Sequence, residues 1–343
     1  MAKTDDITRL ERFEGCLIGG AAGDALGYPV EFSSYEGICA RYGAQGITSY
    51  AADGFSDLAL FSDDTQMALF TAEGLLAAGP DASRATFVRK IHRAYLDWLK
   101  TQEQLPPAGS DGSSLLDEPQ LYARRAPGNT CLSALRSHKM GLMEKPLNNS
   151  KGCGGVMRVA PVGLFVDDAD EAAFVAAMAA AITHGHSMGY VPAAALAFIV
   201  NRCVYGDPVS LQAVVGECID RLPTWFDDDR AAAEDMGRQL ARAAELAAGD
   251  VPDAANIKVL GEGWVGDEAL AIAVYACLRH EDDFGAVLVA AVNHDGDSDS
   301  TGAIAGNVMG AWLGLGAIGP EWTERLELRD LILRVASDLE AAV

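Results

Sequence analysis

The chain has 343 residues, half of them hydrophobic, so it can bury a sizeable core and is expected to be globular. Its 26 basic and 49 acidic residues give a formal charge of -23. Such an excess of carboxylates repels a phosphate backbone, which argues against general nucleic-acid binding and suggests that most of these side chains lie on a solvated surface.

The cysteines and the N-terminal segment indicate the compartment. The seven cysteines are scattered and include no CxxC pair, which is typical of a reducing environment. The N-terminal sequence MAKTDDITRLERFEG has acids and no apolar core of the signal-peptide type. The uncharged stretch 301–319 contains Asn307 and several glycines, so it is not expected to span a membrane. We therefore expect a cytoplasmic monomer without membrane contact.

Helical periodicity runs through the whole chain, because Ala-, Leu- and Met-rich segments have apolar residues three to four positions apart. The predicted helices cover residues 7–27, 64–78, 84–100, 130–142, 170–183, 187–204, 209–221, 230–248, 267–279, 284–293, 300–316 and 321–340. Strand signals are nearly absent. None of the intervening loops is a clear linker; the main ones are 103–119, 144–154, 222–228 and 249–265. The sequence therefore predicts an all-α fold, a compact single-domain helical bundle over residues 1–343.

Two of the predicted helices carry glycine at every fourth position. The two sets are Gly15, Gly19, Gly23 and Gly27, and Gly302, Gly306, Gly310 and Gly314. Each set forms a stripe on one helix face, where missing side chains let another backbone approach. A glycine inside a helix costs about 1 kcal/mol relative to alanine. The stripes predict that these helices, or their immediate neighbours, form a tightly packed centre; a loose compositional bias is the alternative.

A first acid cluster, Ser62-Asp63-Asp64-Thr65, lies just before the apolar run 67–70. Acids and hydroxyls at a helix N-terminus have an ordinary role, because they cap free backbone amides and oppose the helix dipole. Considered alone, this segment is better explained as a helix cap.

A second acid cluster, residues 293–302, reads Asn-His-Asp-Gly-Asp-Ser-Asp-Ser-Thr-Gly and leads into the second glycine-striped helix. Alternating hard oxygen donors suit Mg²⁺, Mn²⁺ or Ca²⁺ better than zinc. The order resembles part of an EF-hand loop, but the segment continues into an apolar helix and lacks the later bidentate Glu. Together, the two clusters provide the ligands that a two-metal site requires. The pairing favours metal binding over simple capping.

Five segments resemble motifs of the ADP-ribosylglycohydrolases, a family that includes bacterial dinitrogenase-reductase-activating glycohydrolases and animal ADP-ribosylarginine hydrolases. The segments are Gly19–Gly27, Ser62–Thr65, Ser150–Arg158, Thr183–His184 and Asp297–Gly302. They occur in the family order and span nearly the whole chain. The resemblance implies an all-α bundle, two Mg²⁺ or Mn²⁺ ions between helix ends, and hydrolysis of the glycosidic bond at the distal ribose of an ADP-ribosylated target.

By this resemblance, each end of the chain supplies half of the metal site. The implied ligands are Ser62, Asp63, Asp64, Asp297, Asp299 and Ser300. Relatives often have Thr at two of these positions, and Ser keeps the oxygen donor. The family often has Gly-Gly where Asp295-Gly296 stands here, so the role of Asp295 is open. We place Asp24 and Asp295 behind the ligands.

The Gly-rich segment 150–158 can expose backbone amides to a pyrophosphate, although a plain Gly-rich turn is the better explanation without the neighbouring motifs. Given the resemblance, the implied ADP-ribose contacts are Ser150, Gly152, Gly154 and His184. His186 is less certain, because a lone His at a helix boundary is more often structural. Trp264 is a candidate platform for adenine, with a buried core tryptophan as the alternative.

The loop around Asn129 resembles a family segment that reaches the distal ribose. Some bacterial relatives have an acid here, whereas an asparagine cannot act as a base at neutral pH. The resemblance instead implies Glu31 as the catalytic residue, since it matches the acid of other branches; an exposed glutamate is the alternative. The metals would orient the ribose, and water directed by Glu31 or acidified by the metals would attack the anomeric carbon.

The implied substrate is an ADP-ribosylated protein, most simply at arginine, or a free ADP-ribose derivative. A serine linkage, O-acetyl-ADP-ribose and a modified nucleic-acid end stay open. Two other classes also stay open. One is a relative that binds ADP-ribose without cleaving it, against which the four intact carboxylate ligands argue. The other is a metal-dependent phosphoesterase, which also uses clustered aspartates.

Overall fold

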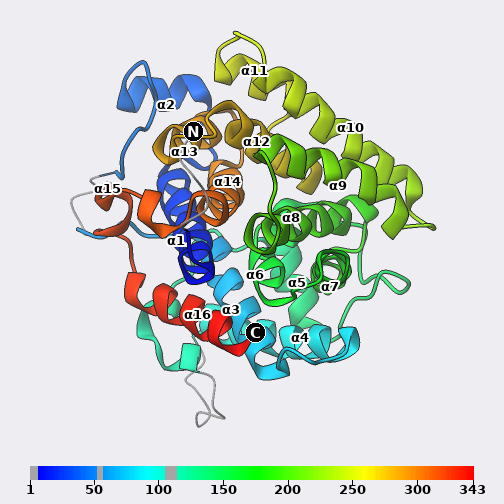
Figure 1. Ribbon diagram of the computed structural model, residues 1–343. Helices are drawn as coiled ribbons and strands as arrows, with labels where there is room; N and C mark the ends of the chain where they lie inside the picture. Colours follow the sequence, from blue (N-terminus) through cyan, green and yellow to red (C-terminus); the bar gives the residue numbers. More distant parts are fainter. Residues whose placement is uncertain (1–6, 52–56, 105–113) are drawn as a thin grey trace.

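The computed structural model describes residues 7–51, 57–104 and 114–343. Within these residues the chain forms 16 α-helices and no β-strand, so the predicted all-α class is confirmed (Figure 1). The helices are α1 (Arg9–Gly27), α2 (Tyr35–Tyr42), α3 (Asp63–Ala78), α4 (Arg84–Gln102), α5 (Asn129–Arg136), α6 (Ala160–Phe165), α7 (Ala169–Ala181), α8 (Ser187–Tyr205), α9 (Leu211–Trp225), α10 (Arg230–Ala247), α11 (Asp253–Leu260), α12 (Gly266–Arg279), α13 (Phe284–Val292), α14 (Ser298–Leu313), α15 (Pro320–Thr323) and α16 (Arg329–Ala342). The 3-10 helices are η2 (Tyr28–Val30), η3 (Ser114–Asp117), η4 (Pro119–Leu121), η5 (Cys153–Gly155) and η6 (Leu315–Ala317).

Two predicted helices are shorter than expected. The helix predicted over 130–142 ends with α5 at residue 136. The helix predicted over 321–340 is divided into α15 and α16. Between these two, the N–H of Glu327 donates to the carbonyl of Ala59. Backbone groups that bond to another segment cannot continue a helix, which explains the break.

Three short helices, α2, α6 and α11, are absent from the sequence prediction. They contain six to eight residues each, too little of the 3.6-residue repeat to be read reliably. Helix α11 lies inside the predicted loop 249–265, and α9 continues into the predicted loop 222–228 through Pro223, near its end. Of the predicted loop 103–119, residues 105–113 lie outside the described residues.

The two glycine stripes face each other at the centre of the molecule, where α1 lies alongside α14 (Figure 1). A Cβ atom built on Gly19 would lie 2.3 Å from the carbonyl oxygen of Gly306, and one on Gly306 would lie 1.9 Å from that of Gly19. Gly23 and Gly302 are related in the same way. No side chain fits between backbones this close, so the predicted tight centre is confirmed.

This pairing is antiparallel, because residue numbers rise along α1 as they fall along α14. Gly27, at the end of α1, packs on Ser298, the first residue of α14. Asp24, one turn earlier, accepts hydrogen bonds from the backbone N–H groups of Ser62 (2.8 Å) and Thr65 (3.0 Å). The amino end of α3 is thereby held at the same place. Three helix ends far apart in sequence converge, and each carries one of the motifs.

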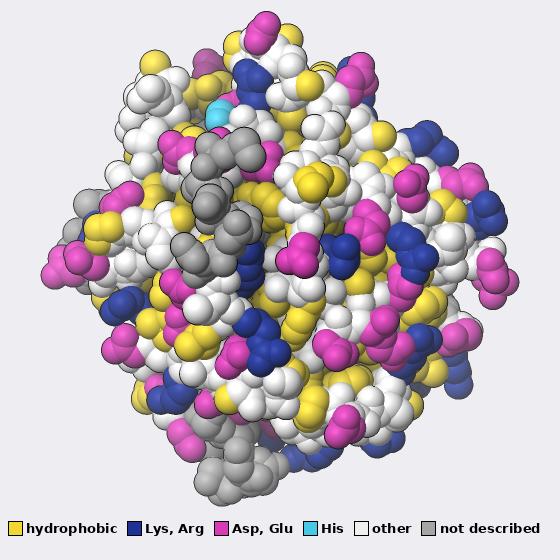
Figure 2. Space-filling view, in the orientation of Figure 1, with side chains coloured by type: hydrophobic (Ala, Val, Ile, Leu, Met, Phe, Trp, Pro, Cys, Tyr) yellow, Lys and Arg dark blue, Asp and Glu magenta, His cyan; other side chains and the backbone are white. Residues whose placement is uncertain are grey.

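Charged side chains cover much of the surface. Acidic and basic groups are interspersed over the described part of the face in Figure 2. Among the described helices, α8 is long and apolar enough to cross a membrane, with a mean hydropathy of 1.3 over its most apolar window. Because 83% of that window is buried inside the protein, packing in the core accounts for its apolar composition.

Candidate metal and substrate site

Buried acids gather where the three helix ends meet. Among the described residues eight Asp or Glu side chains are buried, and five of them belong to this place: Asp24, Asp63, Asp64, Asp297 and Asp299. A cavity of about 330 Å³ opens beside them. The sequence-predicted residues that line it are Glu31, Asp63, Asp64, Asn129, Gly152, Gly154, His184, Asp297, Asp299 and Ser300. Segments from across the chain therefore meet at one cavity.

Glu31 reaches the second acid cluster from the end of α1. It follows η2, and its N–H donates to the carbonyl of Gly27 at 3.0 Å. One carboxylate oxygen of Glu31, one of Asp297 and one of Asp299 all lie within 4.8 Å of one another. The Oε2 atom of Glu31 is shielded from solvent and has no hydrogen-bond partner. The fold thus brings Glu31 to the acids of α14.

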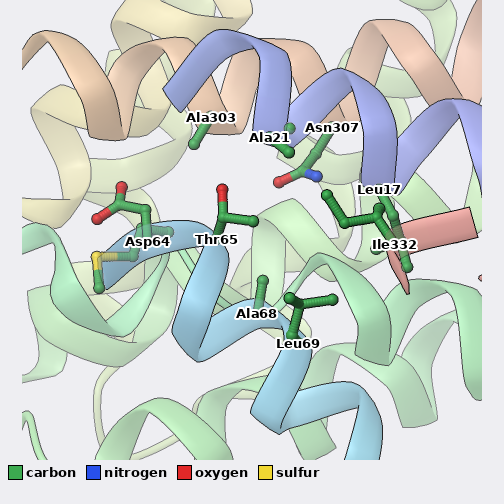
Figure 3. Close-up of a pocket in the computed structure, with 11 residues that line it drawn as sticks. Leu17, Ala21, Asp64, Thr65, Ala68, Leu69, Ala303, Asn307 and Ile332 are labelled. Carbon is green, nitrogen blue, oxygen red and sulfur yellow. The ribbon is translucent and has the colours of Figure 1, made fainter. Parts of the chain in front are cut away.

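The first acid cluster stands at the amino end of α3. Ser62 is the N-cap, and its Oγ accepts a hydrogen bond from the N–H of Asp64 at 3.2 Å. Asp63 accepts from the N–H of Gly128 (3.3 Å), whereas Oδ2 of Asp64 is buried without a partner. Figure 3 shows Asp64 and Thr65 at this end of α3, on the side of α1 and α14. Ser62 therefore serves as the cap, which leaves an oxygen of Asp64 free.

The second acid cluster also both caps a helix and lines the cavity. Asp297 is the N-cap of α14 and accepts from the N–H of Ser300 at 3.4 Å, and Asp299 accepts from the same N–H at 3.0 Å. All three side chains are nearly fully buried yet line the cavity. Capping uses only Oδ1 of Asp297 and Oδ1 of Asp299, so the caps leave the second carboxylate oxygen of each residue for a cation.

Crowding and burial raise the pKa values of these acids. Burial, followed by the nearby charge of Asp299, raises the pKa of Glu31 to about 10 and that of Asp24 to about 7. The same causes hold the pKa values well above the usual range at Asp63, Asp64 and Asp297. Among the described residues, none of these acids forms an ion pair with Lys or Arg.

This arrangement fits divalent cations. Buried carboxylates without counter-charge are costly, and a cation would relieve their repulsion. It would also provide a partner for the unsatisfied oxygen of Asp64. The donors are carboxylate and hydroxyl oxygens, which Mg²⁺ and Mn²⁺ prefer. The residues present therefore suit the metals that the resemblance implies.

The Gly-rich segment forms another wall of the cavity. A Cβ atom on Gly152 would meet His184 and Ser150 at 3.5 Å, an ordinary contact, whereas one on Gly154 would lie 2.9 Å from the His184 ring. Ser150 does not line the cavity. Its Oγ accepts from the N–H of Gly152 at 3.3 Å and lies 3.1 Å from the hydroxyl of Thr130. Ser150 therefore supports the glycines from behind.

His184 faces the glycines as a neutral hydrogen-bond donor. Burial, followed by the charge of Arg158, lowers its pKa to about 3. The hydroxyl of Thr183 accepts a hydrogen bond from Arg158 (2.7 Å) and lies 2.8 Å from Nδ1 of His184. Nε2 of His184 faces Gly152, and a Thr183 hydroxyl that donates to Nδ1 would leave the ring proton on Nε2. His186 has a structural contact instead, because its Nδ1 accepts from the N–H of Met188.

Three further candidates differ in their placement. Asn129, the first residue of α5, is exposed and lines the cavity. Asp295 lies apart, in a neighbouring cavity, and accepts from the N–H of Tyr35 at 2.8 Å.

Trp264 is 37% exposed, so the buried-core alternative is wrong. Its ring stacks on Phe32 with centroids 5.3 Å apart, and both rings line the cavity.

Sequence reasoning did not identify several residues that line the cavity, among them Phe32, Cys131, Cys153 and Met157. The Sγ of Cys153 donates to Oδ2 of Asp297 at 2.8 Å. The sulfur of Met157 lies 3.9 Å from the hydroxyl of Ser300. A cysteine inside the Gly-rich motif was the one sign in the sequence, and it does not reveal which acid the thiol meets.

Comparison with known proteins agrees with this geometry. The family model for ADP-ribosylglycohydrolase matches residues 5–343. ADP-ribosylhydrolase ARH3 of Gallus gallus is 23% identical and aligns with 96% of this chain and 92% of its own. The ADP-ribosyl-(dinitrogen reductase) glycohydrolase of Rhodospirillum rubrum is 25% identical, with 93% and 91% covered. An ADP-ribosylarginine hydrolase of Pseudomonas putida is 24% identical, with 96% and 78% covered.

A solved structure described as an ADP-ribosylglycohydrolase-related protein complex shares the fold. Its TM-score is 0.59 at 24% identity, with 97% of this chain and 98% of that chain covered. The family match extends over both acid clusters, the Gly-rich segment and the helices that bring them together. The chain belongs to the ADP-ribosylglycohydrolase family, whose members hydrolyse ADP-ribose linkages.

Proposed function

We propose that the protein releases ADP-ribose from ADP-ribosylated arginine on protein substrates, with two Mg²⁺ or Mn²⁺ ions as cofactors. The observation that carries this proposal is the meeting of Glu31, Asp297 and Asp299 at a cavity that the Gly-rich segment also lines. The names of the R. rubrum and P. putida relatives refer to an ADP-ribosylated protein and to ADP-ribosylarginine. Clustered carboxylates also favour a cationic leaving group such as guanidinium.

The two acid clusters would hold the cations. The proposed ligands that line the cavity are Asp63, Asp64, Asp297, Asp299 and Ser300. Ser62, the N-cap of α3, completes the proposed set although it does not line the cavity, and Asp24 of α1 stands behind it, bonded to the amino end of α3. When bound, the metals supply Lewis acidity toward the ribose hydroxyls and lower the pKa of water. Glu31 remains on the cavity wall as the group that accepts a proton.

Glu31 is positioned for general-base chemistry. Burial and the nearby charges of Asp299, Asp297 and Asp63 raise the pKa of Glu31. Cations bound to these three acids would compensate their charges and lower that pKa again, which favours an ionised Glu31. It would take a proton from water as the water oxygen bonds to the anomeric carbon. The bond from that carbon to the guanidine nitrogen breaks and its electron pair goes to the nitrogen. The released guanidine then takes the proton held by Glu31, which gives guanidinium and restores the ionised carboxylate.

The opposite wall would bind the rest of ADP-ribose. The neutral Nε2–H of His184 and the backbone near Gly152 and Gly154 suit a pyrophosphate, because they donate hydrogen bonds without needing protonation. Asn129 would contact the distal ribose from the first turn of α5. The exposed face of Trp264 would support adenine.

A panel of linkages tests this function. We expect fast Mn²⁺-dependent release of ADP-ribose from an ADP-ribosyl-arginine peptide, slower release from a serine-linked peptide and O-acetyl-ADP-ribose, and no cleavage of a generic phosphodiester. Asp64→Asn is the inactive control. Binding of ADP-ribose with no turnover on any linkage would contradict an enzymatic role, and preference for the phosphodiester would point to a phosphoesterase.

The cellular setting belongs to the proposal as well. All seven cysteines are free, which supports a reducing, cytoplasmic location. We also propose that the protein acts as a monomer. Sedimentation at working concentration and fractionation of cells check these two points.

A further inference from the structure

Cys153 brings a thiol into direct contact with a proposed metal ligand. Its Sγ lies 2.8 Å from Oδ2 of Asp297, and the residue is half-buried and free. The backbone around it is fixed, because its N–H donates to the carbonyl of Trp264 and its carbonyl accepts from the N–H of Val156. The thiol is therefore held at the cavity wall.

Further donors line the same cavity. Asp64 lines the same cavity and is 3% exposed, and its Oδ2 is shielded from solvent without a hydrogen-bond partner. Met157 follows Cys153 by one helical turn, lines the cavity and places its sulfur 3.9 Å from the hydroxyl of Ser300. One region of the cavity wall thus combines two sulfur atoms with carboxylates, including an unsatisfied one.

We propose that Cys153 and Asp297 form a binding site for a soft divalent cation such as Zn²⁺ or Cd²⁺, and that Asp64 turns toward the bound ion from the same cavity. Thiolate ligands select such ions, whereas Mg²⁺ and Mn²⁺ prefer oxygen. Because the soft cation takes Asp297 from the oxygen-ligand site, it competes with Mg²⁺ or Mn²⁺ and inhibits the enzyme. This inhibition rests on the proposed function, whereas binding of the soft cation does not.

The geometry requires a small adjustment. Zinc bonds of about 2.3 Å to sulfur and 2.0–2.2 Å to oxygen, at a tetrahedral angle, hold the two ligand atoms about 3.5 Å apart. The present contact of 2.8 Å must therefore open by about 0.7 Å, within the reach of side-chain rotation. Binding breaks the S–H bond, forms a sulfur–metal bond and releases the proton to water, without a change in oxidation state.

Cys131 provides a matched control. It lines the same cavity, but its thiol lies 3.3 Å from the guanidinium of Arg158. That charge is buried and repels a cation. Two free thiols therefore face one cavity in opposite electrostatic surroundings, and the proposal applies to Cys153 alone.

Titration of the metal-free protein with Cd²⁺ tests the site through the ultraviolet sulfur-to-cadmium absorption band. We expect a saturable band in the parent chain and in Cys131→Ser. In Cys153→Ser we expect that band to be lost and Cd²⁺ affinity to fall at least about tenfold, since losing even an outer-sphere partner commonly has that effect. An unchanged band in Cys153→Ser, or no saturable band in the parent chain, would overturn the proposal.

A second experiment tests competition. The Zn²⁺ concentration that halves Mn²⁺-dependent release of ADP-ribose should rise at least about tenfold in Cys153→Ser, with each variant referred to its own uninhibited rate. It should also rise with added Mn²⁺ in the parent chain. Inhibition by Zn²⁺ that does not change with the Mn²⁺ concentration would contradict competition between the two metals. Absence of any hydrolysis would refute the proposed function instead, and the cadmium band would still decide whether the soft-cation site exists.

Discussion

Glu31 is the residue whose substitution separates substrate binding from chemistry. Glu31→Gln keeps the size and much of the hydrogen bonding but cannot accept a proton from water. Calorimetry should find that Mn²⁺ and ADP-ribose still bind. Single-turnover hydrolysis of an ADP-ribosyl-arginine peptide should slow by about 10²–10⁴-fold, the usual contribution of a general base.

Asn129, the proposed ribose contact, provides a rescue experiment. Asn129 lines the same cavity as Glu31, so Asn129→Asp in the Glu31→Gln background restores a carboxylate there. Partial recovery of turnover would place both residues at the same ribose face. A loss below about tenfold in Glu31→Gln alone would mean that this residue is a bystander.

Gly152 and Gly154 of the Gly-rich segment differ in what an added side chain would meet, which makes Gly152 the better test. A Cβ atom there makes only ordinary contacts at 3.5 Å, whereas one on Gly154 meets the ring of His184 at 2.9 Å. Gly152→Val should therefore fold, keep Mn²⁺ affinity and bind ADP-ribose at least about tenfold more weakly, because its side chain covers backbone that would face pyrophosphate. Equal ADP-ribose affinity in this folded variant would remove the segment from the site.

At the residue scale, the sequence identified the carboxylates because their motifs are local. Asp295 was predicted to stand behind the ligands, and the structure instead turns it to the neighbouring cavity. Cys153 and Phe32 escaped prediction because their roles depend on Asp297 and Trp264, which lie far away in the chain. Sequence spacing carries no information about such contacts.

At the scale of elements, the packing of α1 on α14 fixes the site. A Cβ atom on Gly306 would lie 1.9 Å from the carbonyl of Gly19, so Gly306→Ala must separate the two helices. We expect this change to lower the free energy of unfolding by about 1–3 kcal/mol, measured by urea denaturation.

The matched control is Gly216→Ala in α9, where a Cβ atom meets nothing within 4 Å. Alanine there should raise the free energy of unfolding by about 0.5–1 kcal/mol, because glycine is a poor helix former. Equal effects of the two substitutions would mean that the glycine stripe reflects composition and not packing.

Long helices were predictable and short ones were not. Two glycine stripes at four-residue spacing predicted a close helix pair, but the antiparallel register that sets Gly27 against Ser298 required the structure. Helix α11 escaped prediction because eight residues show too little periodicity. The break before α16 depends on a distant backbone partner, Ala59.

At the scale of the whole molecule, the buried acids link stability to pH and metal. Asp24 and Glu31 have ordinary pKa values of 3.8 and 4.5, which the fold raises to about 7 and about 10. The folded chain therefore binds more protons than the unfolded chain over the intervening range, and its stability falls as pH rises. The melting temperature of the metal-free protein should fall as the pH rises from about 5 to about 8.

Two controls belong to this experiment. Glu31→Gln removes one of the titrating groups and should show a shallower decline. Stabilisation by Mn²⁺ should grow with pH, because protons compete with the cation for the same carboxylates. A melting temperature that is constant or rises over this range in metal-free protein would contradict the role of the buried acids.

The family and the all-α class could be predicted because five motifs occur in register along the chain. Whether residues 1–343 form a single domain stays a prediction. The convergence of the two acid clusters was inferred from their shared donor chemistry and from the resemblance, since no periodicity in the sequence places Asp64 beside Asp299. That convergence is the central claim about the molecule.

Calorimetric titration of Mn²⁺ into Asp64→Asn and Asp299→Asn tests this claim most directly. Because both acids belong to one site, each single change should weaken Mn²⁺ binding at least about tenfold. The metal-free variants should be as stable as the parent chain or more so, since each removes a repelling acid. Asp295→Asn, which alters a carboxylate that bonds Tyr35, should bind Mn²⁺ like the parent chain. Normal Mn²⁺ affinity in both Asp64→Asn and Asp299→Asn would contradict a metal site built from the two ends of the chain.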